Sequence, residues 1–358
     1  MIWSNFVDLW YNVKYLTFYD AKEKYEFKWE EFCMRERISD SLILNTIKLL
    51  VRAYKIARFC RENGIDMCLS HMEEANFSNI ISKILFWNRS KIFVQIHQSI
   101  NAWWKLYQVL IQSLYNKADK IITIAKEEKE NLVKNYSINR TIIEVIYNPI
   151  DIKKITALVG EDLWTYAHLF GDQKFTFINI WRLTHQKNQE ILLRAFDTLN
   201  RKYQDTRLII LGDGDLKNEL CLQRESLHSK WDIFFLWNQQ NPYKFLHNSD
   251  CFVFTSRYEW FWIVILEAMS CWLPVISTDC KTWPKEILRR QMDTFDEAED
   301  MAFEEYGILI PSDDEMKLFE AMETIYLDRD TQVHYKQKSL ERAQDFKIEK
   351  IFIEWQEL

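Results

Sequence analysis

The chain has 358 residues, of which 48% are hydrophobic and 28% charged, which is typical of a globular protein long enough for two α/β domains. Its formal net charge of -7 argues against a nucleic-acid partner, because a polyphosphate backbone is usually bound by a basic surface. No apolar stretch reaches the roughly 20 residues that cross a bilayer. Since the beginning does not resemble a signal peptide and the seven cysteines show no metal-ligand spacing, we expect a cytoplasmic protein with buried free thiols.

In the first half of the chain, β-rich segments alternate with segments of helical periodicity. This alternation is typical of βα units that build a parallel sheet. Proline at position 149, followed by a polar and irregular stretch to about 173, marks a domain boundary at residue 150. We expect strands at 12–19, 65–70, 91–96, 120–125 and 141–147, and helices at 41–64, 76–86 and 127–136.

The second half repeats the pattern more regularly and ends in two polar helices. It therefore predicts a second α/β domain at 151–334, and we expect the segment 335–358 to form a helix that packs back on the first domain, 1–150. The expected strands are 175–180, 207–211, 233–236, 251–255, 275–278 and 307–311, and the expected helices include 189–203 and 261–271.

Glycine and tryptophan occur in unusual numbers, 6 and 15, where a chain of this length usually carries roughly 25 glycines. Trp272 stands where a helix must end and lead into a buried strand, a position that usually adopts the left-handed conformation and favours glycine. The hypothesis is that UGA codons, which some bacteria read as glycine, are written here as tryptophan. The alternative is a protein that is truly rich in tryptophan. Other tryptophans at turns or strand ends are Trp10, Trp181, Trp237, Trp260, Trp262 and Trp283.

Three segments carry the chemistry. The first is IWRLTHQKN at 180–188, the second is LGDG at 211–214, and the third is SRYEWFWIVILEAMSCWLPVI at 256–276. With tryptophan read as glycine, they are similar to G-R-L-x-x-x-K-N, G-x-G and E-G-F-G-x-x-x-x-E-A-M-A-x-G-x-P-V. The chain thus resembles the family 4 retaining glycosyltransferases, which implies the GT-B fold, in which two Rossmann-like α/β domains with parallel sheets face each other across a cleft.

The resemblance implies roles for individual residues. A sugar nucleotide releases a diphosphate, so its site must stabilise growing negative charge, which Arg182 and Lys187 can do. The helix that begins near Phe261 would add its N-terminal amides, those of Phe261, Trp262 and Ile263. By resemblance, Glu259 hydrogen-bonds the transferred sugar and Glu267 the ribose. The bland alternatives are solvated loop cations, a helix cap and a helix-face charge.

The resemblance to the first domain is looser. His97, which follows the strand 91–96, resembles the family's active-site histidine and would contact the transferred sugar, whereas His71 and His185 are taken as structural. The family's first strand and glycine-rich loop have no counterpart, so we expect that one βα unit is missing at the front. No metal or other cofactor is expected, because the family usually works without one.

The resulting expectation is a retaining glycosyltransferase that moves a hexose or N-acetylhexosamine from a nucleotide-diphosphate sugar to a glycan or lipid-linked acceptor. The segment TDCKTWPKEI at 278–287 resembles members with such acceptors. Peripheral contact with the inner face of a membrane is a further expectation, to which Arg52, Lys55 and Arg58 could contribute unless they form an ordinary solvated face. The alternatives are a non-catalytic binding protein on the same scaffold and a sugar-nucleotide epimerase.

Overall fold

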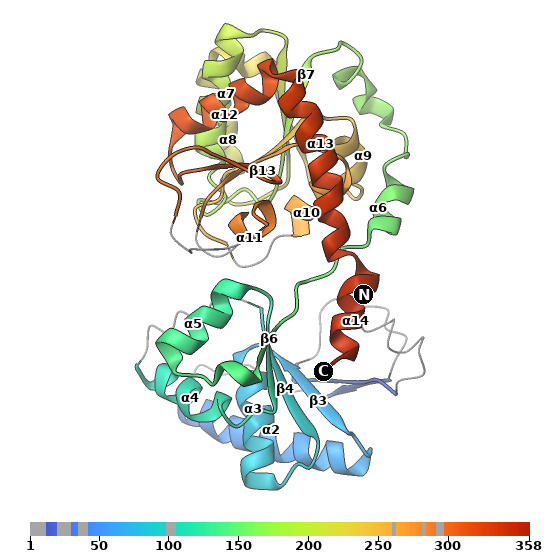
Figure 1. Ribbon diagram of the computed structural model, residues 1–358, viewed down its shortest axis with the longest axis vertical. Helices are drawn as coiled ribbons and strands as arrows, with labels where there is room; N and C mark the ends of the chain where they lie inside the picture. The colour runs from blue at the N-terminus through green and yellow to red at the C-terminus, as the bar shows by residue number, and fades with distance from the viewer. Residues whose placement is uncertain are drawn as a thin grey trace. The chain divides into compact units, whose positions relative to one another are not determined.

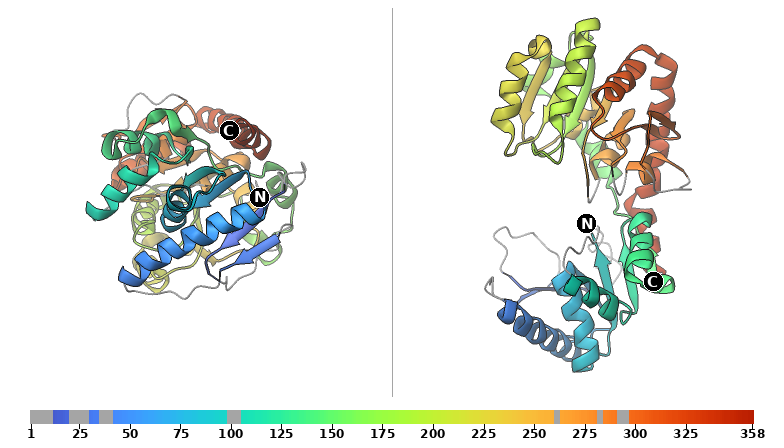
Figure 2. Two further views of the ribbon diagram at one scale, coloured as in Figure 1. Left: turned by 90° about the horizontal axis from the view of Figure 1, so that it is seen from below. Right: turned by 90° about the vertical axis from the view of Figure 1, so that its left-hand side faces the viewer.

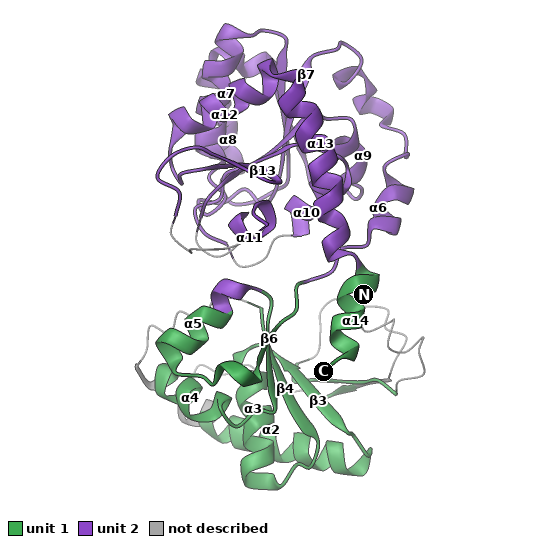
Figure 3. Ribbon diagram, in the orientation of Figure 1, with its two compact units in different colours: residues 1–124, 129–147, 348–358 green, residues 125–128, 148–347 purple. Residues whose placement is uncertain are grey.

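The computed structural model describes residues 12–19, 30–34, 42–97, 105–259, 263–280, 284–290 and 297–358 (Figure 1). The chain divides into two compact units (Figure 3). The first contains residues 1–124, 129–147 and 348–358, and the second contains residues 125–128 and 148–347. The C-terminal segment is therefore divided, because α13 (Arg329–Ala343) belongs to the second unit and α14 (Ile348–Gln356) to the first.

The first unit is built on a parallel sheet with the strand order β3-β4-β5-β6. Because side chains alternate across a strand, Ile92 and Val94 of β4 enter one core cluster and Phe93 enters another. The second cluster includes Ile351 and Trp355 of α14. The elements are β3 (Met67–His71), β4 (Lys91–Ile96), β5 (Lys120–Thr123), β6 (Ile143–Val145), α2 (Leu42–Glu62), α3 (Glu73–Phe86), α4 (Lys105–Tyr115) and α5 (Lys126–Tyr136).

Two further strands of this unit form a separate parallel sheet. They are β1 (Lys14–Thr17) and β2 (Glu30–Cys33). Among the strands that the structure describes, β1 pairs with β2 alone and β3 with β4 alone, so the sheet of this unit is divided. The absence of one βα unit at the front of the first domain stays a prediction.

The second unit has a seven-stranded sheet with the order β12-β13-β11-β10-β7-β8-β9, in which only β12 runs antiparallel. Helices cover both faces of this sheet (Figure 2), with α7 packed against α12 and α10 against α13. The strands are β7 (Phe175–Ile180), β8 (Thr206–Leu211), β9 (Ile233–Trp237), β10 (Cys251–Phe254), β11 (Val275–Thr278), β12 (Ala302–Glu304) and β13 (Gly307–Ile310).

The helices of the second unit are more numerous than the sequence pattern predicts. The stretch after position 150, expected to be irregular, contains α6 (Ile152–Leu158) and a 3₁₀ helix (Trp164–Leu169). Three α-helices rather than two follow β13, and the last of them, α14, belongs to the first unit. Asp151 caps α6 by accepting a hydrogen bond from the Lys154 amide at 2.9 Å. A single capping residue of this kind is not detected by hydrophobic periodicity. The remaining helices are α7 (Gln189–Lys202), α8 (Lys217–Ser226), α9 (Tyr243–His247), α10 (Ile263–Ser270), α11 (Pro284–Leu288) and α12 (Glu315–Leu327).

Candidate functional site

The order of the strands in the second unit indicates where on its sheet a ligand would bind. Strands β7, β8 and β9 are laid down in one direction from β7, whereas β10 and β11 are added on its other side. In open parallel sheets, ligands bind outside the carboxyl ends of the strands where the order reverses, which here is between β7 and β10. The two loops at this point are 181–188 and the loop that begins at Thr255, and they carry Lys187 and Glu259.

Lys187 and Glu259 form a buried ion pair at this switch point. The Lys187 ammonium donates to Oε1 of Glu259, and the two side chains are 8% and 2% exposed. Ser256 donates its hydroxyl to the same carboxylate oxygen, and Gln186 Nε2 lies 3.4 Å from Oε2. Sequence reasoning assigned the two charged residues, and the structure adds Ser256 and Gln186 as the groups that hold the carboxylate.

The electrostatics of the pair are a balance between burial and attraction. Burial lowers the pKa of the Lys187 ammonium, the Glu259 carboxylate opposes this shift, and the nearby Arg182 guanidinium lowers the pKa further. Nζ of Lys187 also lies 4.3 Å from the centre of the Trp181 ring. Lys187 and Glu259 therefore lie in a weakly hydrated place, with the exposed Arg182 beside it, and an anion added there interacts more strongly than in water.

The loop 181–188 is held from both sides. The Thr255 hydroxyl donates to the Lys187 carbonyl at 2.9 Å, and Arg257 donates to the His185 carbonyl at 2.7 Å. Arg257 also pairs with Asp313 at 2.8 Å, and the same carboxylate oxygen accepts from the Asn188 amide. The ring of His185 takes no part in these contacts. It is exposed and lies 3.5 Å from the Glu190 carboxylate.

The two glycines of the Gly-Asp-Gly segment are required by close approach of backbone to backbone. A Cβ on Gly212, whose φ is 139°, would lie 1.8 Å from the Trp181 carbonyl oxygen. A Cβ on Gly214 would lie 2.3 Å from the Leu183 carbonyl oxygen. The segment therefore fixes the path of the loop that carries Arg182 and Lys187, because only a residue without a side chain fits.

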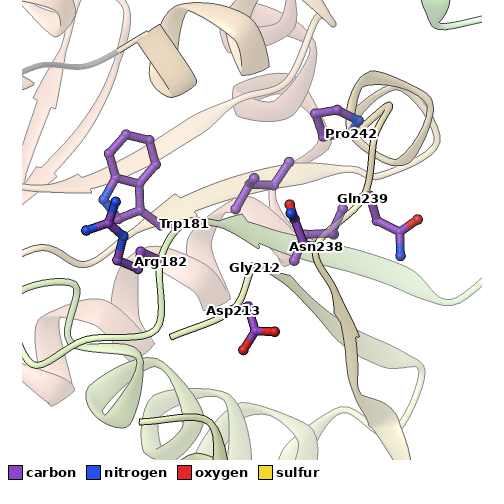
Figure 4. A pocket seen from close by; sticks show the side chains of 9 residues that line it. Trp181, Arg182, Gly212, Asp213, Asn238, Gln239 and Pro242 are labelled. Atoms are coloured by element: carbon purple, nitrogen blue, oxygen red, sulfur yellow. The ribbon is translucent and has the colours of Figure 1, made fainter. Parts of the chain in front are cut away.

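A pocket of about 400 Å³ opens beside this loop, at the carboxyl ends of β7, β8 and β9. Trp181 and Arg182 lie on one side of it, Asn238, Gln239 and Pro242 on the other, and Gly212 with Asp213 between them (Figure 4). The Asp213 carboxylate accepts from the Gly214 amide at 2.9 Å, which together with Lys217 lowers its pKa. The remaining lining residues are Ile180 and Leu211.

Glu267 lies on α10 and has a partner that the sequence did not suggest. The Tyr243 hydroxyl, on α9, donates to Glu267 Oε1 at 2.8 Å. Burial raises the pKa of the Glu267 carboxyl, whereas the hydrogen bond from Tyr243 lowers it. Burial and the carboxylate in turn raise the pKa of the Tyr243 phenol, so the phenol stays protonated and donates. Tyr243 follows Asn241 and Pro242, which mark a turn, and nothing in that pattern points to a carboxylate.

In the first unit, His97 lies at the end of β4, and its ring meets that of His71 at the end of β3. Nδ1 of His71 and Nε2 of His97 are 2.9 Å apart. Burial is the main cause that lowers the pKa of both rings, that of His71 to about 4. His71, which is taken as structural from the sequence, is therefore in direct contact with His97.

Three further expectations concern the start of α10, the basic residues of α2 and contact with a membrane. Phe261 and Trp262 lie outside the described residues, and Ile263 is the first described residue of α10. Arg52 does not belong to a solvated basic face, because it is 3% exposed and pairs with Glu74 at 2.7 Å. In the described part of the chain, no helix is both long and apolar enough to cross a membrane.

Comparison with known proteins matches both halves of the chain to glycosyltransferase families. Residues 12–154 match the family described as glycosyltransferase family 4, and residues 162–342 match the family described as glycosyl transferases group 1. An uncharacterized glycosyltransferase of Methanocaldococcus jannaschii is 35% identical over 97% of this chain and 92% of its own length. The Campylobacter jejuni N-acetylgalactosamine-N,N'-diacetylbacillosaminyl-diphospho-undecaprenol 4-alpha-N-acetylgalactosaminyltransferase is 29% identical over 87% of this chain and 81% of its own.

Solved structures agree on the fold. A glycosyltransferase from Rickettsia africae superposes with a TM-score of 0.75 at 16% identity, covering 92% of this chain and 84% of that one. The Anabaena protein HepE in complex with UDP gives 0.73 at 18% identity, covering 92% and 85%. The expected GT-B fold, with two Rossmann-like units, is thus confirmed. From its fold, its matched families and its relatives, the chain belongs to the group 1, family 4 glycosyltransferases and is an enzyme of that class.

Proposed function

We propose that the protein transfers a hexose or N-acetylhexosamine, with retention of configuration, from a nucleotide-diphosphate sugar to a lipid-linked or glycan acceptor. The observation that carries the proposal is the Lys187–Glu259 ion pair at the point where the strand order of the second unit reverses. It supports the proposal because a cation that would stabilise a diphosphate lies in contact with a carboxylate that would accept hydrogen bonds from sugar hydroxyls.

The reaction breaks the bond between the anomeric carbon and the diphosphate and forms a bond from that carbon to an acceptor oxygen. The acceptor proton passes to the departing diphosphate on the same face. Arg182, Lys187 and the backbone amides of Phe261, Trp262 and Ile263 would stabilise the charge that develops on the diphosphate. Glu259 would accept hydrogen bonds from the transferred sugar, and His97 is a further residue that we expect to contact the transferred sugar.

The donor nucleoside would occupy the pocket beside Arg182, with its ribose hydroxyls bound by Glu267. Three solved structures of HepE, a protein of the same fold, hold UDP or UDP-glucose. The Escherichia coli relative named UDP-Gal:alpha-D-GlcNAc-diphosphoundecaprenol alpha-1,3-galactosyltransferase is 30% identical over 44% of this chain. These relatives support a UDP-sugar as the donor.

The names of two relatives support a lipid-linked acceptor, because both include a diphospho-undecaprenol group. An acceptor of this kind would bring the protein to the cytoplasmic face of a membrane as a peripheral protein. Lys55 and Arg58 on α2 remain candidates for that contact, whereas the buried Arg52 is not one.

We also propose that glycine stands in the natural protein at many positions written as tryptophan. Trp87, Trp164, Trp237 and Trp272 have φ values of 50°, 48°, 55° and 66°, in the left-handed region that favours glycine. Trp355, by contrast, is 7% exposed within a core cluster, as an authentic tryptophan would be. The nucleotide sequence is the test, and UGG at codons 87, 164, 237 and 272 would overturn the idea.

The test of function is Lys187→Ala in protein made from the authentic gene, with Lys202→Ala as control. Lys202 forms an exposed ion pair with Glu323 at 2.7 Å and should not affect transfer. We expect UDP release from UDP-sugars to fall at least about 100-fold in Lys187→Ala with donor binding weakened, and EDTA to leave the rate of the parent protein unchanged. Turnover close to that of the parent would remove Lys187 from the proposed role, and binding of UDP-sugars without transfer would favour a non-catalytic scaffold.

A further inference from the structure

Helix α2 of the first unit has two apolar faces, and only one of them is buried. The helix packs against α3 (Figure 1), and Ala53, Ile56 and Ala57 are buried. The other face is a row of apolar side chains, which we call the α2 row, and each member is between 42% and 53% exposed. Its members are Ile47, Leu50, Val51 and Tyr54.

The α2 row follows the period of the helix. At 3.6 residues per turn, positions 47, 50, 51 and 54 fall on one side of the helix, and Arg58 and Arg61 continue the same line, over about 21 Å in all. The Tyr54 ring meets that of Phe86, the last residue of α3, edge to face at 5.6 Å. Since the other face of α2 already supplies the buried contacts, the core does not require this row.

Basic side chains accompany the α2 row. In a chain with a net charge of -7, α2 carries a single acid, Glu62. Its basic residues are Lys48, Arg52, Lys55, Arg58 and Arg61.

Four of these five basic residues lie on or beside the row, since Arg52 is buried. Lys48 and Lys55 each follow a member of the row by one position, so both lie on the same side of it. Arg58 pairs with Glu62 at 2.7 Å, and both side chains are exposed, so this ion pair is solvated and contributes little. Arg58 can therefore exchange Glu62 for another anion at little cost.

An apolar row with cations along it matches the surface of an anionic bilayer. A helix of this kind lies in the interface, with its apolar side chains among the acyl chains and its basic side chains at the headgroups. Tyr54 suits the same place, because its ring is apolar and its hydroxyl is polar. A second copy of the chain fits less well, because in a symmetric contact the row would meet itself and bring the cations of both copies together.

We propose that the α2 row docks the protein on a membrane that contains anionic phospholipid. The inference rests on the proposed function for its purpose, since a lipid-linked acceptor lies in a bilayer. Binding to vesicles is measured without any sugar donor or acceptor, so the two proposals are tested separately.

Co-sedimentation of the full chain, made from the authentic gene, with lipid vesicles tests the row. We expect binding to vesicles of equal parts phosphatidylcholine and phosphatidylglycerol to be at least about tenfold tighter than to phosphatidylcholine alone. Leu50→Gln/Tyr54→Gln keeps good helix formers and should weaken binding at least about tenfold. The matched control is Leu222→Gln/Leu327→Gln, which changes two exposed apolar residues on α8 and α12 of the second unit and should bind as the parent does.

A second pair of variants tests the charges. Lys55→Gln/Arg61→Gln should lower the affinity for the anionic vesicles at least about tenfold and leave binding to phosphatidylcholine unchanged. Arg194→Gln/Lys202→Gln removes the same charge from α7, where both residues form exposed ion pairs, and should have no effect. Equal weakening by the two variants would show that net charge rather than the α2 row drives binding, and would overturn the proposal.

The remaining outcomes are distinct. The proposal fails if the parent protein does not bind anionic vesicles, or if a folded Leu50→Gln/Tyr54→Gln binds them equally well. A dimer in analytical ultracentrifugation that this variant dissociates would assign the row to a second copy instead. Should the variant not fold, Ile47→Gln/Val51→Gln takes its place with the same expectation. Vesicle binding without sugar transfer would refute the proposed function and leave the docking surface, whereas transfer without vesicle binding would do the reverse.

Discussion

Lys187 and Glu259 are charges that a folded protein rarely buries without a purpose. Desolvation of two ions costs several kcal/mol, and their mutual attraction repays this only when further hydrogen bonds are present, as Ser256 provides here. A pair of this kind is poor evidence for stability, since apolar side chains of similar size often replace it without loss. The proposed donor would use both charges and so gives the pair a purpose other than stability.

A double-mutant cycle separates the structural role of the pair from its functional role. Glu259→Gln keeps a side chain that can bond to Ser256 but leaves the Lys187 cation buried, so we expect the free energy of unfolding to fall by about 3 kcal/mol. Adding Lys187→Met should recover most of that loss without restoring transfer. The measurements are denaturant unfolding and UDP release. Recovery of both stability and activity would show that the pair serves only the fold.

The bond between Tyr243 and Glu267 predicts a dependence on pH. In the proposed ribose-binding role, Glu267 accepts stronger hydrogen bonds when it is ionised, so the donor KM should rise as the pH falls through the pKa of this carboxyl. Because the hydrogen bond from Tyr243 lowers that pKa, Tyr243→Phe should move the rise to higher pH and increase the donor KM about tenfold at pH 7, with kcat less affected.

The control for this variant is Tyr326→Phe. The Tyr326 hydroxyl donates to Asp205 at 2.7 Å, and Asp205 immediately precedes β8, at the opposite end of that strand from the pocket. Its removal should leave the pH profile unchanged. Identical profiles for Tyr243→Phe and the parent protein would show that Glu267 does not act through Tyr243.

At the scale of elements, the hydrogen bonds at the end of α10 show which backbone conformation position 272 requires. After α10, the Leu273 amide donates to the Ala268 carbonyl at 3.2 Å and the Trp272 amide to the Met269 carbonyl at 3.0 Å. These two bonds define a Schellman motif, in which the residue with left-handed backbone is usually glycine. The expected conformation of Trp272 is confirmed by its φ of 66°.

Two exposed tryptophans of the second unit provide a matched comparison. Trp164 and Trp231 are 76% and 79% exposed, but only Trp164 has a positive φ. Trp164→Gly should raise the free energy of unfolding by about 1 kcal/mol by relieving the left-handed conformation. Trp231→Gly should lower it by about 0.5 to 1 kcal/mol, because glycine gains backbone freedom in the unfolded chain. Chemical unfolding measures both, and equal effects of the same sign would contradict this explanation.

At the scale of the whole molecule, the last helix of the chain belongs to the core of the first unit. Trp355 and Ile351 of α14 pack against Phe93 of β4. Trp355→Ala should therefore lower the free energy of unfolding of the first unit by about 3 to 5 kcal/mol, as for a buried tryptophan, and leave that of the second unit unchanged. Calorimetry resolves this if the units unfold in separate transitions. A loss confined to the second unit would place α14 elsewhere.

The sequence pattern located most strands within two residues, because buried strands carry long apolar runs, as in β4 and β7. It missed α4, and it missed β2, whose short segment is charged at its start. The candidate site was recognisable because Arg182, Lys187, Glu259 and Glu267 lie in motifs whose spacing is intact. Tyr243, Ser256 and His71 could not be assigned, since each contacts a residue that the sequence pattern does not pair with it.

The sequence by itself determined the alternating α/β architecture and the family, because both are written in local spacing: apolar runs of strand length, and charged residues at fixed offsets along one loop or one helix. Only the tertiary structure decided which charges meet. Lys187 and Glu259 are 72 positions apart and His71 and His97 are 26 apart. They come together because parallel strands deliver their carboxyl ends to one edge of a sheet, and this depends on the order of the strands in space rather than along the chain.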